Sequence, residues 1–251
     1  MASKEIDLNC DMGESYGRFK IGNDEVVMQY ISSCNIACGF HGGDPLTIQR
    51  TIELALKNGV KVGAHPGFPD LQGFGRRSMQ LPEEELFAIM QYQVAAVKGM
   101  TEAAGGKLRH VKPHGALYNM AAKDDQVAEI IVKAILSIDP QLVLYGPPNS
   151  SLTKKAKSYD LVCKNEVFAD RNYNEDLSLV DRQNSNALIS EIQSMFEHVL
   201  YMLRDGKVKT ISGVIKAIKA QTICIHGDKP NAGEVARFLS ENLQAAGFYV
   251  R

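Results

Sequence analysis

Residues 33–45 read Ser-Cys-Asn-Ile-Ala-Cys-Gly-Phe-His-Gly-Gly-Asp-Pro, and this stretch decides the fold. Ser33–Cys38 is short and largely apolar, which predicts a strand covered on both faces. The glycines that follow predict a loop, and Asp44-Pro45 predicts a helix start, with Asp as the N-cap and Pro at the first helical position. The stretch is therefore one strand–loop–helix unit with a histidine in its loop.

The same unit recurs along the chain, with longer helical patterns between short β-branched runs. The other predicted strands are Glu5–Asn9, Val60–Ala64, Leu108–Lys112, Leu142–Tyr145, Leu161–Asn165 and Thr222–Ile225. This alternation predicts an α/β fold with a mostly parallel sheet, which right-handed crossovers let close into a barrel of seven or eight strands. An open doubly wound sheet is the competing architecture.

Helix boundaries support this organisation. The helix that starts at Asp44-Pro45 stops at Gly59, and the one that opens with Pro82–Glu85 stops at Gly105. Further helices are predicted near 188–203 and 230–246. Residues 205–220 do not follow the alternation of strands and helices. Two Gly-containing turns lie around β-branched residues there, which predicts a hairpin excursion. We expect one domain over residues 1–251.

Composition excludes several classes of function. The formal net charge is −1, so the chain has no excess of positive charge with which to bind nucleic acid. The N-terminal residues contain no apolar leader and no run approaches a membrane span, so we expect a cytoplasmic protein that does not engage a membrane. The five cysteines are expected to be buried, reduced thiols; the alternative, a metal clip at Cys34 and Cys38, lacks a second ligand pair.

Polar residues follow nearly every predicted strand. Because the carboxyl ends of parallel strands lie on one face of the fold, these residues are expected to converge on a single site. The strand-end segments are 9–14, 39–44, 65–70, 112–118, 166–171 and 226–228, and they contain His41, His65, His114 and His226 together with several acids and glycines.

Several of these residues have a structural alternative. Asp44 and Asp228 precede helices and suit either capping or catalysis. His110 and His114 have metal-ligand spacing, but on a strand they would lie about 13 Å apart, so His110 is assigned to structure and His114 to the site. Lys112 points into the barrel, which requires an ion pair with Glu166 or Asp11, or a catalytic role.

Residues 72–77, Gln-Gly-Phe-Gly-Arg-Arg, form the best candidate for anion binding. Backbone N–H groups of a glycine-rich loop and two guanidinium groups suit phosphate or carboxylate oxygens. A solvated loop is the alternative. The sequence contains no P-loop, no dinucleotide fingerprint and no G-x-S-x-G elbow, so a nucleotide site would have to be unconventional or lie on another chain.

At these motifs the sequence resembles the LamB/YcsF family, the A subunits of bacterial 5-oxoprolinase. The matching stretches are residues 7–15, 33–44, 63–70, 111–118, 166–171 and 224–228, which run from the first strand to the last. The resemblance implies a distorted (β/α) barrel related to carbohydrate deacetylases. It also implies ATP-dependent cleavage of 5-oxoproline to L-glutamate, with ATP as co-substrate and with B and C partner subunits.

Under this hypothesis the candidate residues fall into two groups. Asp11 or Glu166 would be the general base, His65 and His114 would position water or move protons, and Lys112 would hold an anion together with Arg76 or Arg77. The catalytic candidates are Asp11, His65, Lys112, His114 and Glu166, and the substrate- or phosphate-binding candidates are Glu14, His41, Asp44, Arg76, Arg77, Tyr118, Asp170, Arg171, His226 and Asp228.

Two other functions compete with this one. A metal-dependent deacetylase acting on an N-acetylated sugar would hold a divalent ion with Asp11, His65 and His114. Related deacetylases carry two adjacent acids after the first strand, whereas here Met12 follows Asp11. A non-catalytic scaffold is the third possibility, and the cost of burying so many ionisable groups argues against it.

Overall fold

The computed structural model describes residues 4–251, so residues 1–3 of the expected domain lie outside it. Within that range, seven parallel strands form a closed barrel. They are β1 (Lys4–Met12), β2 (Ser33–Ala37), β3 (Lys61–His65), β4 (Leu108–Val111), β5 (Val143–Gly146), β6 (Cys163–Phe168) and β9 (Thr222–Ile225). The strands pair in this order, and the pairing of β9 with β1 closes the ring. The barrel is confirmed over the open sheet.

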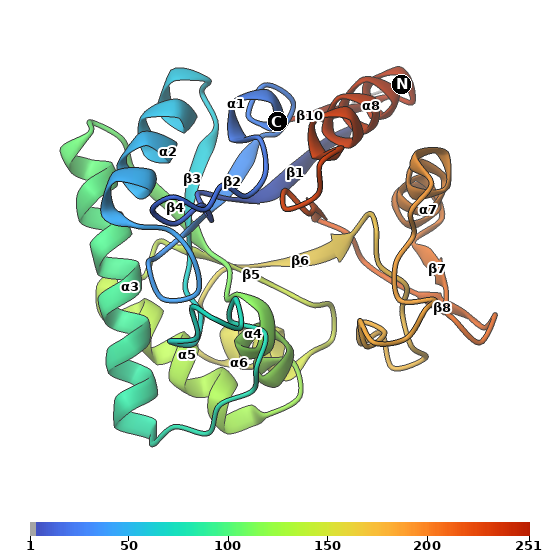
Figure 1. Ribbon diagram of the computed structural model, residues 1–251. Helices are drawn as coiled ribbons and strands as arrows, with labels where there is room; N and C mark the ends of the chain where they lie inside the picture. The colour runs from blue at the N-terminus through green and yellow to red at the C-terminus, as the bar shows by residue number, and fades with distance from the viewer. Residues whose placement is uncertain (1–3) are drawn as a thin grey trace.

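Helices surround the strands, as Figure 1 shows. Their bounds are α1 (Asp24–Val27), α2 (Pro45–Lys57), α3 (Glu83–Ala103), α4 (Gly115–Ala121), α5 (Asp125–Ile138), α6 (Ser151–Ser158), α7 (Ile192–Asp205) and α8 (Ala232–Ala245). Asp44 caps α2 as predicted, because its side chain accepts hydrogen bonds from the N–H groups of Leu46 and Thr47.

The predicted hairpin is also present. β7 (Lys207–Lys209) pairs antiparallel with β8 (Ile215–Ala217), outside the barrel and beside α7 (Figure 1). A short strand that the sequence did not suggest, β10 (Phe248–Val250), pairs with the first residues of β1. It continues the sheet beyond the ring rather than entering it.

The barrel interior is polar at several levels. For this reason two strands end later in the structure than the sequence pattern predicted. β1 extends to Met12 because Asp7, Asn9 and Asp11 alternate with the core residues of the strand and are themselves buried. Asp7 accepts hydrogen bonds from Ser33, Tyr145 and Thr222. In the same way β6 runs to Phe168 and includes Glu166. The apolar criterion ended both strands too early, since inward-facing positions here carry polar side chains with hydrogen-bond partners.

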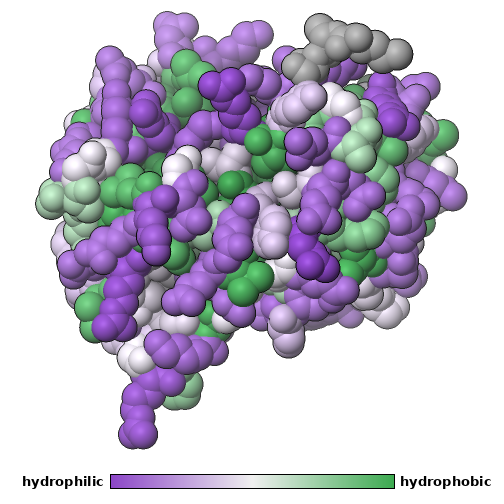
Figure 2. All heavy atoms as spheres, turned by 90° about the horizontal axis from the view of Figure 1, so that it is seen from above, coloured by the Kyte–Doolittle hydropathy of each residue, from purple (hydrophilic) through white to green (hydrophobic). Residues whose placement is uncertain are grey.

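The outer surface carries mainly polar side chains. On the face in Figure 2, hydrophilic residues predominate and apolar ones occur as separated spots. Among residues 4–251, no helix is long and apolar enough to cross a membrane.

Candidate active site

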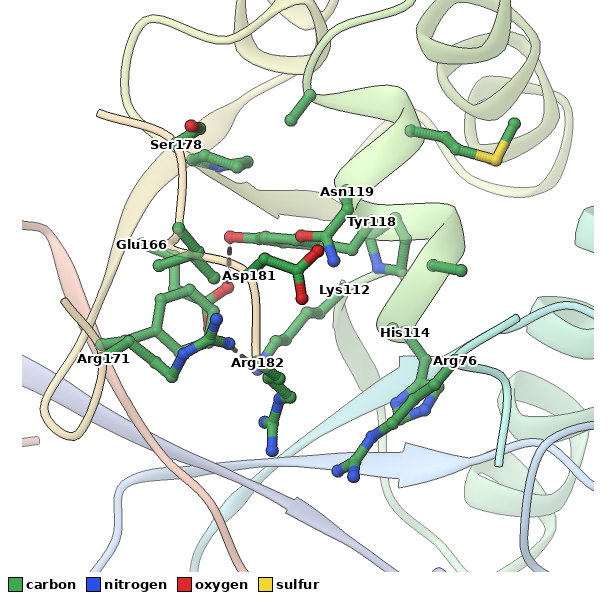
Figure 3. Close-up of a pocket in the computed structure, with 18 of the residues that line it drawn as sticks. Arg76, Lys112, His114, Tyr118, Asn119, Glu166, Arg171, Ser178, Asp181 and Arg182 are labelled. Carbon is green, nitrogen blue, oxygen red and sulfur yellow. Dashed lines mark hydrogen bonds and ion pairs between the residues drawn. The ribbon is translucent and has the colours of Figure 1, made fainter. Parts of the chain in front are cut away.

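A cavity of about 1180 Å³ opens at the carboxyl ends of the barrel strands. Its lining comes from the segments after β1, β3, β4, β6 and β9, and from residues 173–183 of the long connection between β6 and α7. Figure 3 shows the side chains that face this space, among them Lys112, Glu166, Arg171 and Arg182. The strand-end segments therefore converge as the parallel topology requires.

Lys112 forms a buried ion triad with the two acids that the sequence offered as partners. Its Nζ lies 2.8 Å from Asp11 Oδ1 and 3.0 Å from Glu166 Oε1. Tyr118 donates a hydrogen bond of 2.7 Å to Glu166 Oε2, and Asn35 donates one of 2.8 Å to Asp11 Oδ1. Glu166 Oε2 thus accepts a hydrogen bond, and Oε1 has an ion pair with Lys112 but no hydrogen bond among the described residues. Asp11 Oδ2 has a longer contact of 3.4 Å with His65 Nε2.

The triad keeps its members charged. Burial opposes the charge on Asp11, but His65 and Lys112 outweigh it and hold the pKa of this carboxyl well below its usual range. Burial likewise disfavours the Lys112 ammonium, but Asp11 and Glu166 raise the pKa of Lys112 well above its usual value. Asp11 is therefore a carboxylate at neutral pH, in the form that can accept a proton.

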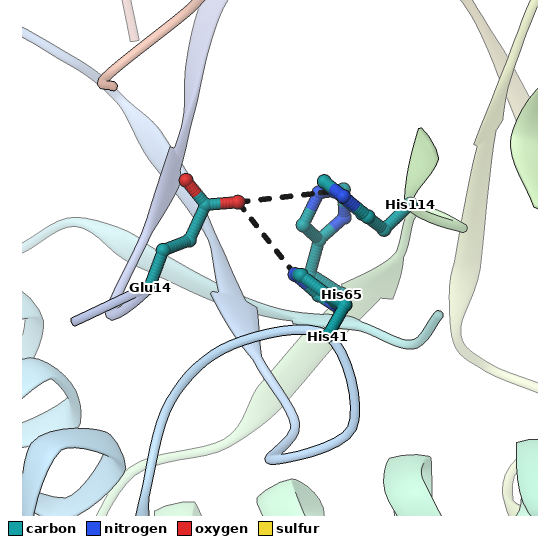
Figure 4. Close-up of side chains that lie close together, drawn as sticks. All are labelled: Glu14, His41, His65 and His114. Atoms are coloured by element: carbon teal, nitrogen blue, oxygen red, sulfur yellow. Dashed lines mark hydrogen bonds and ion pairs between the residues drawn. The ribbon is translucent and has the colours of Figure 1, made fainter. Parts of the chain in front are cut away.

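Beside the triad, Glu14, His41, His65 and His114 form a compact group that we call the His/Glu cluster (Figure 4). One donor atom from each residue lies within 4.8 Å of the others, and all four side chains are buried. His41 stacks on His114 with ring centroids 3.7 Å apart. Glu14 Oε1 lies 3.6 Å from His41 Nε2 and 3.8 Å from His114 Nδ1.

A second histidine system lies across the cavity. His226 Nε2 accepts a hydrogen bond of 2.8 Å from Arg182, so its Nδ1 carries the proton and donates to Asp170 Oδ1 at 2.7 Å. Lys229 also contacts Asp170, at 2.8 Å. Burial favours the neutral acid, but His226 and Lys229 outweigh it and lower the pKa of Asp170. This carboxylate thereby fixes the tautomer and the orientation of His226.

Three arginines contribute positive charge to the cavity. Arg76 pairs with Asp228 at 2.8 Å across the mouth. Arg171 is buried and donates to the Val180 carbonyl oxygen. Burial, with the neighbouring Arg182, lowers the pKa of Arg171 to about 10, so it remains cationic at neutral pH. Together with Lys112 these groups suit an anionic ligand.

Comparison with known proteins settles the relationship. The family model described as "LamB/YcsF family" matches residues 6–251. The chain belongs to the LamB/YcsF family. A relative from Brevibacillus brevis, named as the A subunit of 5-oxoprolinase, is 49% identical over 98% of this chain and 97% of its own length.

Solved structures agree with this family assignment. The "Lactam Utilization Protein" from Thermus thermophilus is 43% identical and superposes with a TM-score of 0.93, over 98% of this chain and 99% of that one. A family 4 carbohydrate esterase from Streptomyces lividans also matches, over 99% of this chain and 92% of that one, but at 12% identity and a TM-score of 0.47. A match that distant carries no functional implication.

Most of the candidate residues predicted from the sequence line the cavity. They are Asp11, Glu14, His65, Arg76, Lys112, His114, Tyr118, Glu166, Arg171, His226 and Asp228. Asp170 lies behind His226, and His41 lies behind His114, so both support lining residues. His110 is structural, as expected: it stacks on Tyr145 and bonds Asn35 inside the barrel.

Asp44 and Arg77 lie elsewhere, and neither is part of the cavity lining. Asp44 caps α2 and also accepts the Gly17 N–H, and these hydrogen bonds lower its pKa to about 2. Arg77 is largely exposed and pairs with Asp70. Asp44 is therefore a helix cap, the structural alternative that the sequence offered. Arg77 forms a local ion pair outside the cavity.

The glycine-rich loop at 72–77 supports the site through its carbonyl groups. His114 Nε2 donates to the Phe74 carbonyl oxygen at 2.8 Å, and the Gly75 carbonyl oxygen accepts the Ala116 N–H. Gly75 has a φ of +64° and packs so closely that a Cβ would lie 2.7 Å from the His114 ring. From this loop, Arg76 is the side chain that reaches the cavity as an anion-binding candidate.

Sequence reasoning missed Arg182, Asp181 and Ser178, which line the cavity from the connection after β6. That connection carries no strand-end motif, so the sequence contained no signal that its residues belong to the site. All five cysteines are free and four of them are buried as expected, whereas Cys163 is only half-buried. Burial raises the pKa of Cys38 to about 12. Neither Cys34 nor Cys38 belongs to the group of candidate metal ligands found among the described residues.

Proposed function

We propose that this chain is the A subunit of an ATP-dependent 5-oxoprolinase, which opens the lactam of 5-oxoproline to L-glutamate together with B and C subunits. The 49% identity, over 98% of this chain, to a protein named as the A subunit of 5-oxoprolinase carries the proposal. The cavity supports it, because it presents a charged carboxylate, a buried ammonium group and several arginines in one space. We expect the complex to act in the cytoplasm, where ATP is available.

The proposed chemistry is hydrolysis of an activated cyclic amide. A five-membered lactam is a poor electrophile, and transfer of a phosphoryl group from ATP to its amide oxygen would make the ring carbon attackable by water. One water adds to the ring carbon, the C–N bond breaks and the nitrogen gains a proton, which leaves an acyl phosphate on the opened chain. A second water hydrolyses this acyl phosphate, so the products are L-glutamate, inorganic phosphate and the ADP left by the phosphoryl transfer. The nucleotide site would involve the partner subunits, since the sequence has no standard nucleotide motif.

Asp11 is the better general base of the two acids. It is charged, it lines the cavity, and its Oδ2 has a single long contact with His65 among the described residues. Both Glu166 oxygens are engaged by Lys112 and Tyr118. We therefore assign Asp11 to proton abstraction from water and Glu166 to holding Lys112 in place.

The cationic side chains of the cavity are assigned to anion recognition. 5-Oxoproline carries a carboxylate, and its activated form carries phosphate oxygens. Arg171 and Arg182 are inside the cavity and Arg76 is at its mouth. Planar guanidinium groups bind both kinds of anion with two parallel hydrogen bonds.

The deacetylase alternative is less well supported by the geometry. It requires Asp11 to ligate a metal with His65 and His114, but Asp11 Oδ1 is already paired with Lys112. The donor group that converges instead contains Glu14 and His41.

The test is turnover of 5-oxoproline by the three reconstituted subunits with ATP. Asp11→Asn should lower the rate of glutamate formation by about 10²–10⁴-fold, as expected for the loss of a general base. Asp139→Asn, at the end of α5 and outside the cavity lining, is the matched control. Undiminished turnover by Asp11→Asn would remove Asp11 from the mechanism.

A further inference from the structure

The two histidines His65 and His114 face each other with nitrogens that both lack a proton when the rings are neutral. His65 Nδ1 lies 2.7 Å from the Lys112 carbonyl oxygen, which can only accept, so Nδ1 carries the hydrogen. His114 Nε2 lies 2.8 Å from the Phe74 carbonyl oxygen and carries its hydrogen for the same reason. The remaining nitrogens, His65 Nε2 and His114 Nδ1, are 2.9 Å apart.

Two lone pairs at that distance repel unless a cation lies beside them. A backbone carbonyl that accepts the second ring N–H is also the usual outer partner of a metal-ligating histidine, because it fixes the tautomer and turns the free nitrogen toward the ion. Here two histidines have such a partner and direct their free nitrogens to one point.

Glu14 and His41 complete the set of donors at this point. Both His41 nitrogens and Glu14 Oε1 are buried without a hydrogen-bond partner among the described residues. Unpaired polar atoms that are this deeply buried are costly. Glu14 Oε1 lies 3.6 Å from His41 Nε2, so these two unpaired atoms lie close together inside the cluster.

We infer that the His/Glu cluster binds one divalent transition-metal ion of the zinc type through Glu14, His41, His65 and His114. Three imidazole nitrogens and one carboxylate oxygen match the donors that zinc takes in a four-coordinate site. Magnesium and calcium prefer shells made of oxygen ligands, so they fit this set poorly. The Lys112 ammonium pairs with Asp11 Oδ1, whereas the contact with His65 is made by Asp11 Oδ2.

The position of the ion relative to the cavity follows from the lining. Glu14, His65 and His114 line the cavity, and His41 stacks behind His114. A metal held by the four would sit in the cavity wall next to Asp11, whose Oδ2 is 3.4 Å from His65 Nε2. Metal binding at this point requires no assumption about the lactam substrate, so it can be tested without the partner subunits.

The experiment is equilibrium dialysis of the full chain against Zn²⁺, followed by elemental analysis, and repeated with Co²⁺ read by visible absorption. We expect about one zinc ion per chain and a Co²⁺ spectrum of the four-coordinate kind. Glu14→Gln keeps the shape of the side chain and should weaken zinc affinity by more than about 100-fold, since loss of an outer-shell partner alone costs about 10–100-fold. His41→Ala should do the same.

His226→Ala is the control, because His226 lines the same cavity but lies outside the cluster, and it should retain the ion. Thermal unfolding checks that each variant folds, and added zinc should raise the Tm of the wild type but not that of Glu14→Gln. A wild-type chain without stoichiometric zinc would overturn the inference and indicate a proton shared by His65 and His114. Equal binding by wild type and both cluster variants would also overturn it.

Discussion

At the scale of single residues, Lys112 shows how the site keeps charge inside a barrel. Its side chain is almost fully buried, yet two carboxylates contact its ammonium group at 2.8 Å and 3.0 Å. Each charge is stable there only because the others are present. The arrangement holds Asp11 in its ionised form next to the cavity, which is the property that we assign to the general base.

Replacing Lys112 should therefore destabilise the fold as well as stop turnover. Lys112→Met leaves two carboxylates buried without a cation, and we expect the free energy of unfolding to fall by about 3–5 kcal/mol at neutral pH. The deficit should shrink as the pH is lowered, because protonation removes the unpaired charges. Urea unfolding at several pH values measures it.

The double variant Lys112→Met, Glu166→Gln provides the matched comparison, since it removes one of the two unpaired charges. It should recover part of the lost stability. If Lys112→Met is as stable as the wild type at every pH, the ion triad does not have the role described here.

Asp170 allows a second prediction, on pH. Because its pKa in the folded chain is lowered, its carboxylate stabilises the fold at pH values above the unfolded pKa of about 3.9. This contribution is lost as the pH falls through the folded pKa. Asp170→Asn should therefore be less stable than the wild type near pH 7, with a difference that narrows in acid.

Denaturant unfolding across this pH range provides the measurement. Asp205→Asn is the control, since Asp205 is exposed at the end of α7. A stability difference for Asp170→Asn that stays constant into acid would show that the carboxylate acts through its shape rather than its charge.

At the scale of elements, helices outside the barrel hold the loops that carry the site. Gln93 on α3 is fully buried and contacts the backbone of Gly67 twice. Its Nε2 donates to the Gly67 carbonyl oxygen, and its Oε1 accepts the Gly67 N–H, both at 2.9 Å. The loop that follows His65 is thus tied to the helix layer.

Gln93→Leu should leave both backbone groups of Gly67 buried without a partner. We expect a loss of about 1–3 kcal/mol in unfolding free energy for each group. Gln91→Leu is the control, because Gln91 is on the same helix but is exposed. Equal stability of the two variants in chemical unfolding would contradict the proposed tie between α3 and the loop.

The elements also show what the sequence could predict. Apolar runs located the seven barrel strands, and turn signals located the hairpin of β7 and β8. The ends of β1 and β6 were misplaced because Asp11 and Glu166 are inward-facing residues of a polar interior. Apolar patterning carries no signal for such positions.

The same limit applies to the candidate site. Strand-end motifs found Asp11, His65, Lys112 and His114, because a parallel barrel brings strand ends together whatever their spacing in sequence. Arg182 lies in a long connection without a motif, and its approach to His226 depends on the path of that loop. The convergence of Glu14 and His41 on His114 likewise depends on loop geometry that the sequence pattern does not contain.

At the scale of the whole molecule, the closed barrel gathers the polar strand ends into one cavity, and the lactam chemistry that we propose is assigned to this cavity. The ion triad, the His/Glu cluster and the three arginines all border the same space. A site with this content suits hydrolysis of a small anionic substrate better than a scaffold role, since each buried charge has a cost that a scaffold would not need.

The most direct test of the central claim is glutamate formation from 5-oxoproline and ATP by the B and C subunits, with and without this chain. We predict sustained product formation with the chain present, and loss of glutamate formation when it is left out. Restoring the chain should restore the rate in proportion to the amount added. Equal glutamate formation by the B and C subunits alone would contradict the account.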